Sequence, residues 1–277
     1  MAYVVHTPGL GFRILCISKG VFVALKGRNL ARAYGLMVAP LDSVRYFEFD
    51  FMWSRMQKIK IQSYLDISSP RLLPLMVISK NSDLIADLIN PDKKDLPKTI
   101  SLAISFGIRD KCRFHAKLIE DAELKENSFD LITSMSVIEH ITNDKDAIQK
   151  MWSLLRPGGV LLISVPCAAN ASEEYTNLND YELIDKNENG FVFWQRYYDE
   201  KLIHERIFSV TGMPKICKIY GEKEAGSYQV NVTQKRSNPF YPYWREPFMM
   251  GMEYEHKKQF KELPGMGVIA MEFIKPF

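Results

Sequence analysis

The sequence has few cysteines, few glycines and no long apolar run. Its cysteines are Cys16, Cys112, Cys167 and Cys217. They form no Cys-x-x-Cys pair and no metal-ligand spacing, so we expect no metal site and regard reduced thiols in a cytoplasmic protein as the simplest explanation. No run of about 18 apolar residues occurs, so we expect no membrane span. With 15 Gly and 14 Pro, collagen-like and low-complexity classes are excluded.

Neither sign of charge dominates the chain. The 36 Lys and Arg residues against 33 Asp and Glu residues give a net charge of +3, which is no strong nucleic-acid signal. The segment from Met1 to Leu41 is an exception, because it holds five basic residues and no acidic one. This segment is either a solvated basic surface or a surface that touches phosphates or anionic lipid. The apolar fraction of 47% excludes disorder of the whole chain.

Strand-like and helix-like segments alternate between residues 63 and 166, which predicts an α/β domain with a parallel sheet. The expected strands are residues 63–67, 84–87, 112–117, 129–134 and 160–165. The expected helices include residues 71–78 and 96–106. A third is expected to follow Asn143 as its cap and to end at residues 156–159. The first helix is apolar nearly all round, so we expect it to be buried against the sheet. A serine before Pro70 is typical of its start.

The two ends of the chain have a different character. We expect an N-terminal extension over residues 1–60 and a polar loop over 170–190, followed by a region rich in aromatic residues. Two strand-like segments, 216–220 and 268–274, come last. The predicted organisation is therefore an extension (1–60) and one domain (61–277) with a cap insertion around 170–265.

Three segments occur in an order that resembles a known family. Residues 64–68 are a strand with an acidic turn, residues 129–141 read FDLITSMSVIEHI, and residues 154–164 read LLRPGGVLLIS. Together they resemble the class I S-adenosylmethionine-dependent methyltransferases, in the type-11-like branch. The resemblance covers residues 61–166, and the last two strands fit the family's antiparallel hairpin. It implies a Rossmann-like seven-stranded sheet, here with a helical N-terminal extension and an aromatic C-terminal cap.

The first of these segments departs from the family, whose pattern after the strand is Asp-x-Gly-x-Gly. Ser68 and Pro70 stand where glycines are expected. Glycine permits a positive φ and a close approach of the backbone, and proline removes an N–H. Either the hydroxyls of Ser68 and Ser69 replace backbone contacts, with Arg71 pairing with the cofactor's carboxylate, or the loop is filled and cofactor binding is weakened or lost.

The resemblance implies further cofactor contacts at the second strand. Asp87, followed by Leu88, stands where the family's acid accepts the ribose hydroxyls, with a solvated strand end or helix cap as the alternative. Asp66 would orient the glycine-like loop or contact the cofactor's amino group. Its alternative is a helix cap or a turn.

The adenine side of the expected site departs from the family as well. The family's adenine-side acid falls at Leu118, which cannot accept a hydrogen bond, and its apolar neighbour falls at Ile119. Glu120 or Asp121 would replace the acid if the loop is shifted, and otherwise both are solvated loop residues.

The fourth strand and the segment after it supply the remaining candidates. Ser134 and Met135 end that strand beneath the reactive end of the cofactor, although Met135 equally suits core packing. His140 is the candidate catalytic base for a hydroxyl substrate, and a hydrogen-bonded structural histidine is its alternative.

The activity that the resemblance implies is methyl transfer from S-adenosylmethionine to an O or N atom of a small-molecule or glycan-like acceptor. Such a transfer needs little beyond alignment and exclusion of water. The rival hypothesis is a non-catalytic methyltransferase-like module that acts through partner or ligand binding. Nothing in the sequence indicates an oligomeric state.

Overall fold

The computed structural model describes residues 7–27, 29–178, 184–238 and 240–277, and it divides the chain into two compact units. Unit 1 comprises Met1–Lys58 and Lys218–Ile269, and unit 2 comprises Ile59–Cys217 and Ala270–Phe277. The first boundary lies next to the one expected after residue 60. Residues 218–269 group with the N-terminal segment, however, and not with the domain that we expected to run from residue 61 to 277.

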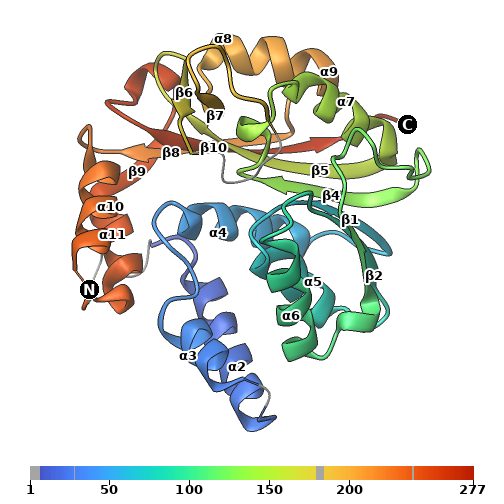
Figure 1. Ribbon diagram of the computed structural model, residues 1–277. Helices are drawn as coiled ribbons and strands as arrows, with labels where there is room; N and C mark the ends of the chain where they lie inside the picture. The colour runs from blue at the N-terminus through green and yellow to red at the C-terminus, as the bar shows by residue number, and fades with distance from the viewer. Residues whose placement is uncertain (1–6, 28, 179–183, 239) are drawn as a thin grey trace. The chain divides into compact units, whose positions relative to one another are not determined.

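Unit 2 contains the parallel strands that the sequence predicts (Figure 1). They are β1 (Ser63–Ile67), β2 (Ile85–Ile89), β3 (Cys112–His115), β4 (Phe129–Met135) and β5 (Leu155–Cys167). β1 pairs with β2 and β4, β2 with β3, and β4 with β5, all in parallel. The strand order reverses between β1 and β4, and open α/β sheets bind ligands at the carboxyl ends of the strands at such a switch point.

The helices of unit 2 lie between these strands, as expected. The three long ones are α5 (Leu72–Lys80), α6 (Leu96–Phe106) and α7 (Asp144–Leu154). Shorter turns are η1 (Arg109–Lys111), η2 (Ile138–His140), α8 (Glu200–Ile203), η3 (His204–Phe208) and α9 (Ser209–Thr211). Residues 73–78 of α5 are buried, which confirms the prediction from its all-apolar sequence. The predicted serine cap of this helix is wrong, because no side chain caps it.

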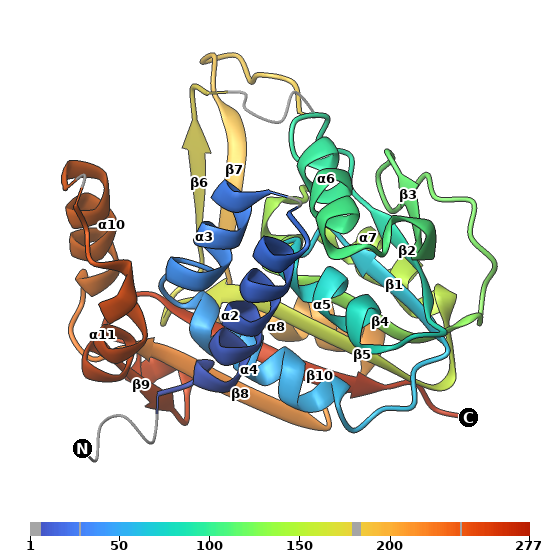
Figure 2. The same ribbon diagram turned by 90° about the horizontal axis from the view of Figure 1, so that it is seen from below.

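The polar segment after β5 differs from the expected loop. Ser172–Thr176 forms β6, which pairs antiparallel with β7 (Val192–Tyr197) in a two-stranded ribbon (Figure 2). Residues 172–175 are exposed, so this strand carries no apolar alternation that a sequence pattern could reveal. Residues 179–183 of the expected loop lie outside the described residues.

Unit 1 is built from segments far apart in the chain. Its helices are α2 (Leu10–Leu25), α3 (Leu30–Val38), α4 (Arg45–Met56), α10 (Ser227–Ser237) and α11 (Glu246–Glu253), with short turns η4 (Tyr243–Arg245) and η5 (Phe260–Glu262). Phe47 of α4 stacks on Tyr220 at a ring distance of 4.9 Å, and the Ser43 N–H donates to Glu246 Oε2 at 3.0 Å. The first three helices confirm the predicted helical extension.

The remaining strands are β8 (Ile216–Glu222), β9 (Tyr254–Lys257) and β10 (Gly267–Ile274). Among the described residues, the hydrogen-bonded strand order is β3-β2-β1-β4-β5-β10-β8-β9. This sheet has eight strands, so the predicted count of seven is wrong, although the Rossmann-like α/β class is confirmed. The unforeseen strand is β9, whose four residues are too few for a recognisable pattern. Within the described ranges, no helix combines the length and apolarity that a membrane crossing requires.

Candidate functional site

The turn after β1 keeps a glycine-like backbone although it contains no glycine. Ser68 has a φ of 49°, in the left-handed region that favours glycine. Its N–H and its hydroxyl both donate to the Ile89 carbonyl, at 2.8 and 3.1 Å. A non-glycine residue in this region costs on the order of 1–3 kcal/mol, which these two bonds to the end of β2 help to offset.

Ser69 joins the ends of β1 and β4. Its N–H donates to Asp66 Oδ2 at 3.1 Å, and its hydroxyl accepts from the Met135 N–H at 3.0 Å. Ser69 and Met135 are both buried. The Ser69 hydroxyl therefore supports the turn, and Met135 packs in the core.

Asp66 is a buried carboxyl group at the switch point. Its Oδ1 accepts from the Thr133 hydroxyl at 2.5 Å and from the Tyr64 hydroxyl at 3.3 Å. Burial raises the pKa of Asp66 to about 6, although the hydrogen bonds from Thr133 and Ser69 act in the opposite direction. These contacts suit the predicted role of orienting the loop, and a contact with the cofactor stays a prediction.

Arg71 and Asp87 both have partners within unit 2. Arg71 forms an ion pair with Asp95, at the start of α6. Asp87 accepts from Arg113 Nε and Nη2, at 3.0 and 2.7 Å, and lies 2.7 Å from His115 Nε2. A carboxylate offers about four acceptor positions, so one position of Asp87 remains for a ribose hydroxyl. The predicted cofactor contacts of both residues stay predictions.

The position of Asp87 in its strand differs from our expectation. β2 runs on to Ile89, so Asp87 lies in the middle of the strand and not at its end. Leu88, the next residue, is buried, as is Ile119 after β3, and their cofactor contacts stay predictions.

Glu120, two residues after Leu118, has a buried carboxylate oxygen. Its Oε2 is buried, and no described residue forms a hydrogen bond with it. Burial is the main cause of the raised pKa of Glu120, with further contributions from the charges of Asp121 and Asp146. A buried carboxylate oxygen without a donor is unfavourable, so this residue is suited to a ligand that donates a hydrogen bond.

A second strained serine follows β4. Ser136 has a φ of 48°, and its N–H donates to the Ser164 carbonyl at 2.9 Å. Ser134, two residues earlier, is fully buried, and its hydroxyl has no hydrogen-bond partner among the described residues. β1 and β4 thus both lead into left-handed serines at the same edge of the sheet. Such strain clusters at functional sites. Sequence reasoning missed Ser136, because the residue type serine does not indicate a positive φ.

His140 has a fixed orientation at the end of η2. Its Nδ1 lies 2.6 Å from the carbonyl oxygen of Trp194 on β7, and the two rings are 5.3 Å apart. A carbonyl oxygen only accepts, so Nδ1 carries the proton and the lone pair of neutral His140 lies on Nε2. Glu139 Oε1 lies 3.9 Å from that Nε2. Sequence reasoning did not foresee Trp194, which lies 54 residues away along the chain.

Comparison with known proteins identifies a domain that includes Glu120, Ser136 and His140. Residues 96–212 match a family model described as a methyltransferase domain. The chain contains a methyltransferase domain. This finding confirms the resemblance, and S-adenosylmethionine is the cofactor of the family. No curated protein matches the chain in sequence.

Solved structures share the fold of the methyltransferase domain. Coclaurine N-methyltransferase bound to N-methylheliamine and S-adenosylhomocysteine is 14% identical, with a TM-score of 0.51 over 82% of this chain and 71% of that chain. Geranyl diphosphate C-methyltransferase from Streptomyces coelicolor A3(2) is 6% identical, with a TM-score of 0.50 over 81% and 76%. The [4+2]-cyclase SpnF is 13% identical, with a TM-score of 0.50 over 82% and 80%. At these identities the likeness shows the fold alone.

Among the described residues, no group of three or more His, Cys, Asp or Glu side chains could hold a metal ion.

Proposed function

We propose that this domain transfers a methyl group from S-adenosylmethionine to an O or N atom of a small-molecule or glycan-like acceptor. The observation that carries the proposal is the imidazole of His140, whose Nδ1 is held by the Trp194 carbonyl. Its Nε2 would take the proton of a hydroxyl or amine acceptor. The acceptor atom then attacks the methyl carbon, the carbon–sulfur bond breaks, and the thioether product leaves with the electron pair.

The residues at the edge of the sheet fit the cofactor. When bound, S-adenosylmethionine supplies an electrophilic methyl group on a sulfonium sulfur. Glu120 would accept from the adenine amino group, because its buried Oε2 has no donor among the described residues. Asp87 would accept from a ribose hydroxyl, and Ser68 has a left-handed backbone in the turn after β1, although it is not a glycine.

Calorimetric titration of the full chain with S-adenosylmethionine and with its demethylated product tests the cofactor half of the proposal. We expect measurable binding of both compounds. Asp87→Ala should weaken it about ten-fold, or 1.4 kcal/mol, because a ribose hydroxyl loses its acceptor. Asp83→Asn, on an exposed residue of the same unit, is the matched control and should leave the affinity unchanged. No heat of binding at millimolar cofactor, in a folded protein, would contradict the proposal.

The acceptor class is tested separately, with methyl-labelled cofactor and panels of phenols, amines and sugars. Two solved structures with this fold are named for coclaurine and for geranyl diphosphate, which supports small acceptors. Label that appears only in added proteins would contradict a small-molecule acceptor. A cytoplasmic location also remains our proposal. Its support is the four unpaired thiols, and subcellular fractionation tests it.

One observation favours a second function, a non-catalytic module. Arg71 and Asp87 are both held by side chains of the same unit, and Pro70 offers no N–H. The fold also occurs in a protein named for cyclisation and not for methylation. Titration separates the two candidates, because the second predicts that neither S-adenosylmethionine nor its product binds the folded chain.

A further inference from the structure

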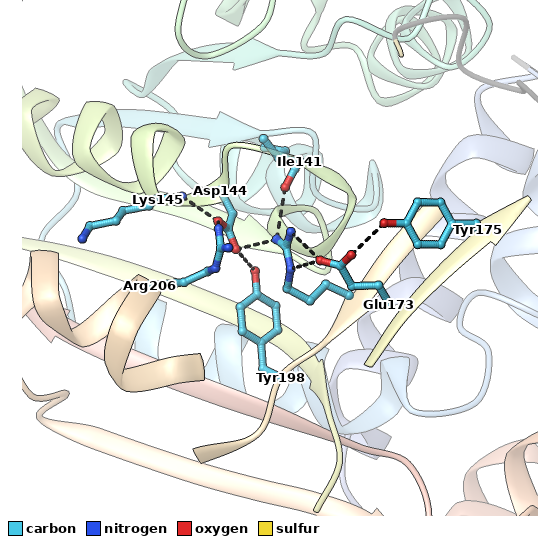
Figure 3. Close-up of polar contacts among 8 residues, drawn as sticks. Ile141, Asp144, Lys145, Glu173, Tyr175, Tyr198 and Arg206 are labelled. Atoms are coloured by element: carbon cyan, nitrogen blue, oxygen red, sulfur yellow. Dashed lines mark hydrogen bonds and ion pairs between the residues drawn. The ribbon is translucent and has the colours of Figure 1, made fainter. Parts of the chain in front are cut away.

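A buried carboxylate begins α7, four residues after His140. Asp144 is fully buried, and its Oδ2 accepts from Arg196 Nη1 at 2.7 Å and from the Tyr198 hydroxyl at 2.6 Å. Its Oδ1 accepts from Arg206 Nη1 at 2.6 Å, and Figure 3 shows the carboxylate between Arg206 and Tyr198. A buried charge is tolerated only with such partners, so Asp144 fixes the side chains around it.

Arg196 extends this network in two directions. Its Nη1 also lies 3.4 Å from the carbonyl of Ile141, the residue directly after His140. Its Nε donates to Glu173 Oε1 on β6 at 3.0 Å, and Glu173 in turn accepts from the Tyr175 hydroxyl at 2.8 Å (Figure 3). The Arg196 side chain is 5% exposed and that of Asp144 is fully buried, so the bond between these two is shielded from water, whereas Glu173 is 40% exposed. The guanidinium therefore ties the β6–β7 ribbon to the segment that carries His140.

Contacts with that segment come from Trp194 and Arg196 of β7 and from Tyr198, the residue after β7. The Trp194 carbonyl contacts His140. The Arg196 guanidinium and the Tyr198 hydroxyl both contact Asp144. The end of the strand is itself fixed, because the Tyr198 N–H donates to the Pro166 carbonyl at 3.1 Å. The position of the Trp194 carbonyl thus depends on the Asp144–Arg196 pair.

We propose that Asp144 and Arg196 are positioning residues that hold His140 in the tautomer with the proton on Nδ1. A free imidazole prefers the proton on Nε2, and the carbonyl 2.6 Å from Nδ1 reverses that preference. A hydrogen bond weakens steeply with distance and angle, so release of β7 returns the proton to Nε2 and removes the lone pair there. The role in catalysis rests on the proposed function, whereas the tautomer is a property of the folded chain alone.

Nitrogen-15 NMR of the full chain labelled at histidine measures the tautomer directly, at a pH where His140 is neutral. We expect a protonated Nδ1 in the unaltered protein and a shift toward protonated Nε2 in Arg196→Met. Tyr198→Phe removes one hydroxyl from Asp144 and should give a smaller shift in the same direction. It keeps the test decisive if the arginine variant does not fold. Lys201→Met, which removes an exposed positive charge on α8, is the matched control and should change nothing.

Kinetics with an accepted substrate give the second measurement. Arg196→Met should lower kcat at least ten-fold and leave the Kd of S-adenosylhomocysteine within two-fold. An unchanged tautomer in a folded Arg196→Met or Tyr198→Phe protein overturns the inference. The tautomer shift without methylation of any acceptor would instead refute the proposed function and leave the positioning role standing.

Discussion

Replacing Asp66 by asparagine should remove a pH dependence from the free energy of unfolding. Burial raises the pKa of this carboxyl from 3.8 to about 6, so the folded chain holds the proton more tightly than the unfolded chain does. The stability that protonation contributes is present below about pH 3.8. It is lost as the pH rises to about 6, and above that value the folded state carries a buried negative charge.

The magnitude follows from the two pKa values. Each pKa unit corresponds to 1.36 kcal/mol, so the difference between 3.8 and about 6 gives about 3 kcal/mol over the whole window. Asparagine stays neutral but loses one acceptor oxygen, which costs about 1 kcal/mol. We therefore expect Asp66→Asn to be about 1 kcal/mol less stable than the unaltered protein near pH 4, and about 2 kcal/mol more stable at pH 8.

Urea unfolding followed by far-ultraviolet circular dichroism, at several pH values, measures this difference. All other titrating groups cancel when the variant is compared with the unaltered protein at each pH. Asp83→Asn is the matched control, because Asp83 is exposed and its removal should give no crossing of the two stability curves. Curves for Asp66→Asn that run parallel to those of the unaltered protein would refute the reasoning.

Three further predictions concern the same edge of the sheet. Ser68→Gly should be about 1–2 kcal/mol more stable than Ser68→Ala in urea unfolding, because glycine relieves the strain at a φ of 49° and alanine does not; equal stabilities would contradict the strain. Glu120→Ala should weaken binding of S-adenosylhomocysteine about ten-fold by calorimetry, while Glu123→Ala on the exposed loop should not, and equal losses would argue against an adenine contact. His140→Asn should lower kcat about 100-fold with an unchanged cofactor Kd, and full activity would remove the histidine from the mechanism.

Local sequence signals predicted the elements of unit 2 well and its contacts poorly. The first strand was expected at residues 63–67 and β1 occupies Ser63–Ile67, because an apolar run followed by a turn signal acts over a few residues. The ion pair of Asp87 with Arg113 depends on the parallel pairing of β2 with β3, which no local pattern specifies. The same holds for Trp194, whose carbonyl contacts His140 only after the chain has formed β5 and the β6–β7 ribbon.

The departures from the family pattern were visible in the sequence, but their outcome was not. The replacement of glycine by Ser68 left two hypotheses open, a replaced contact or a filled loop. The structure gives the serine a left-handed backbone and directs its hydroxyl to the Ile89 carbonyl. Which conformation a residue takes depends on the partners that the folded chain offers, and those partners come from another strand.

The division of unit 1 between two distant stretches of the chain has a consequence for protein synthesis. Its first helices leave the ribosome early. Phe47 cannot stack on Tyr220, and the Ser43 N–H cannot donate to Glu246, until those later residues have been synthesised. Residues 59–217 of unit 2 are complete by then. While residues 59–217 are synthesised, Phe47 therefore still lacks its aromatic partner, and folding helpers would act during that interval.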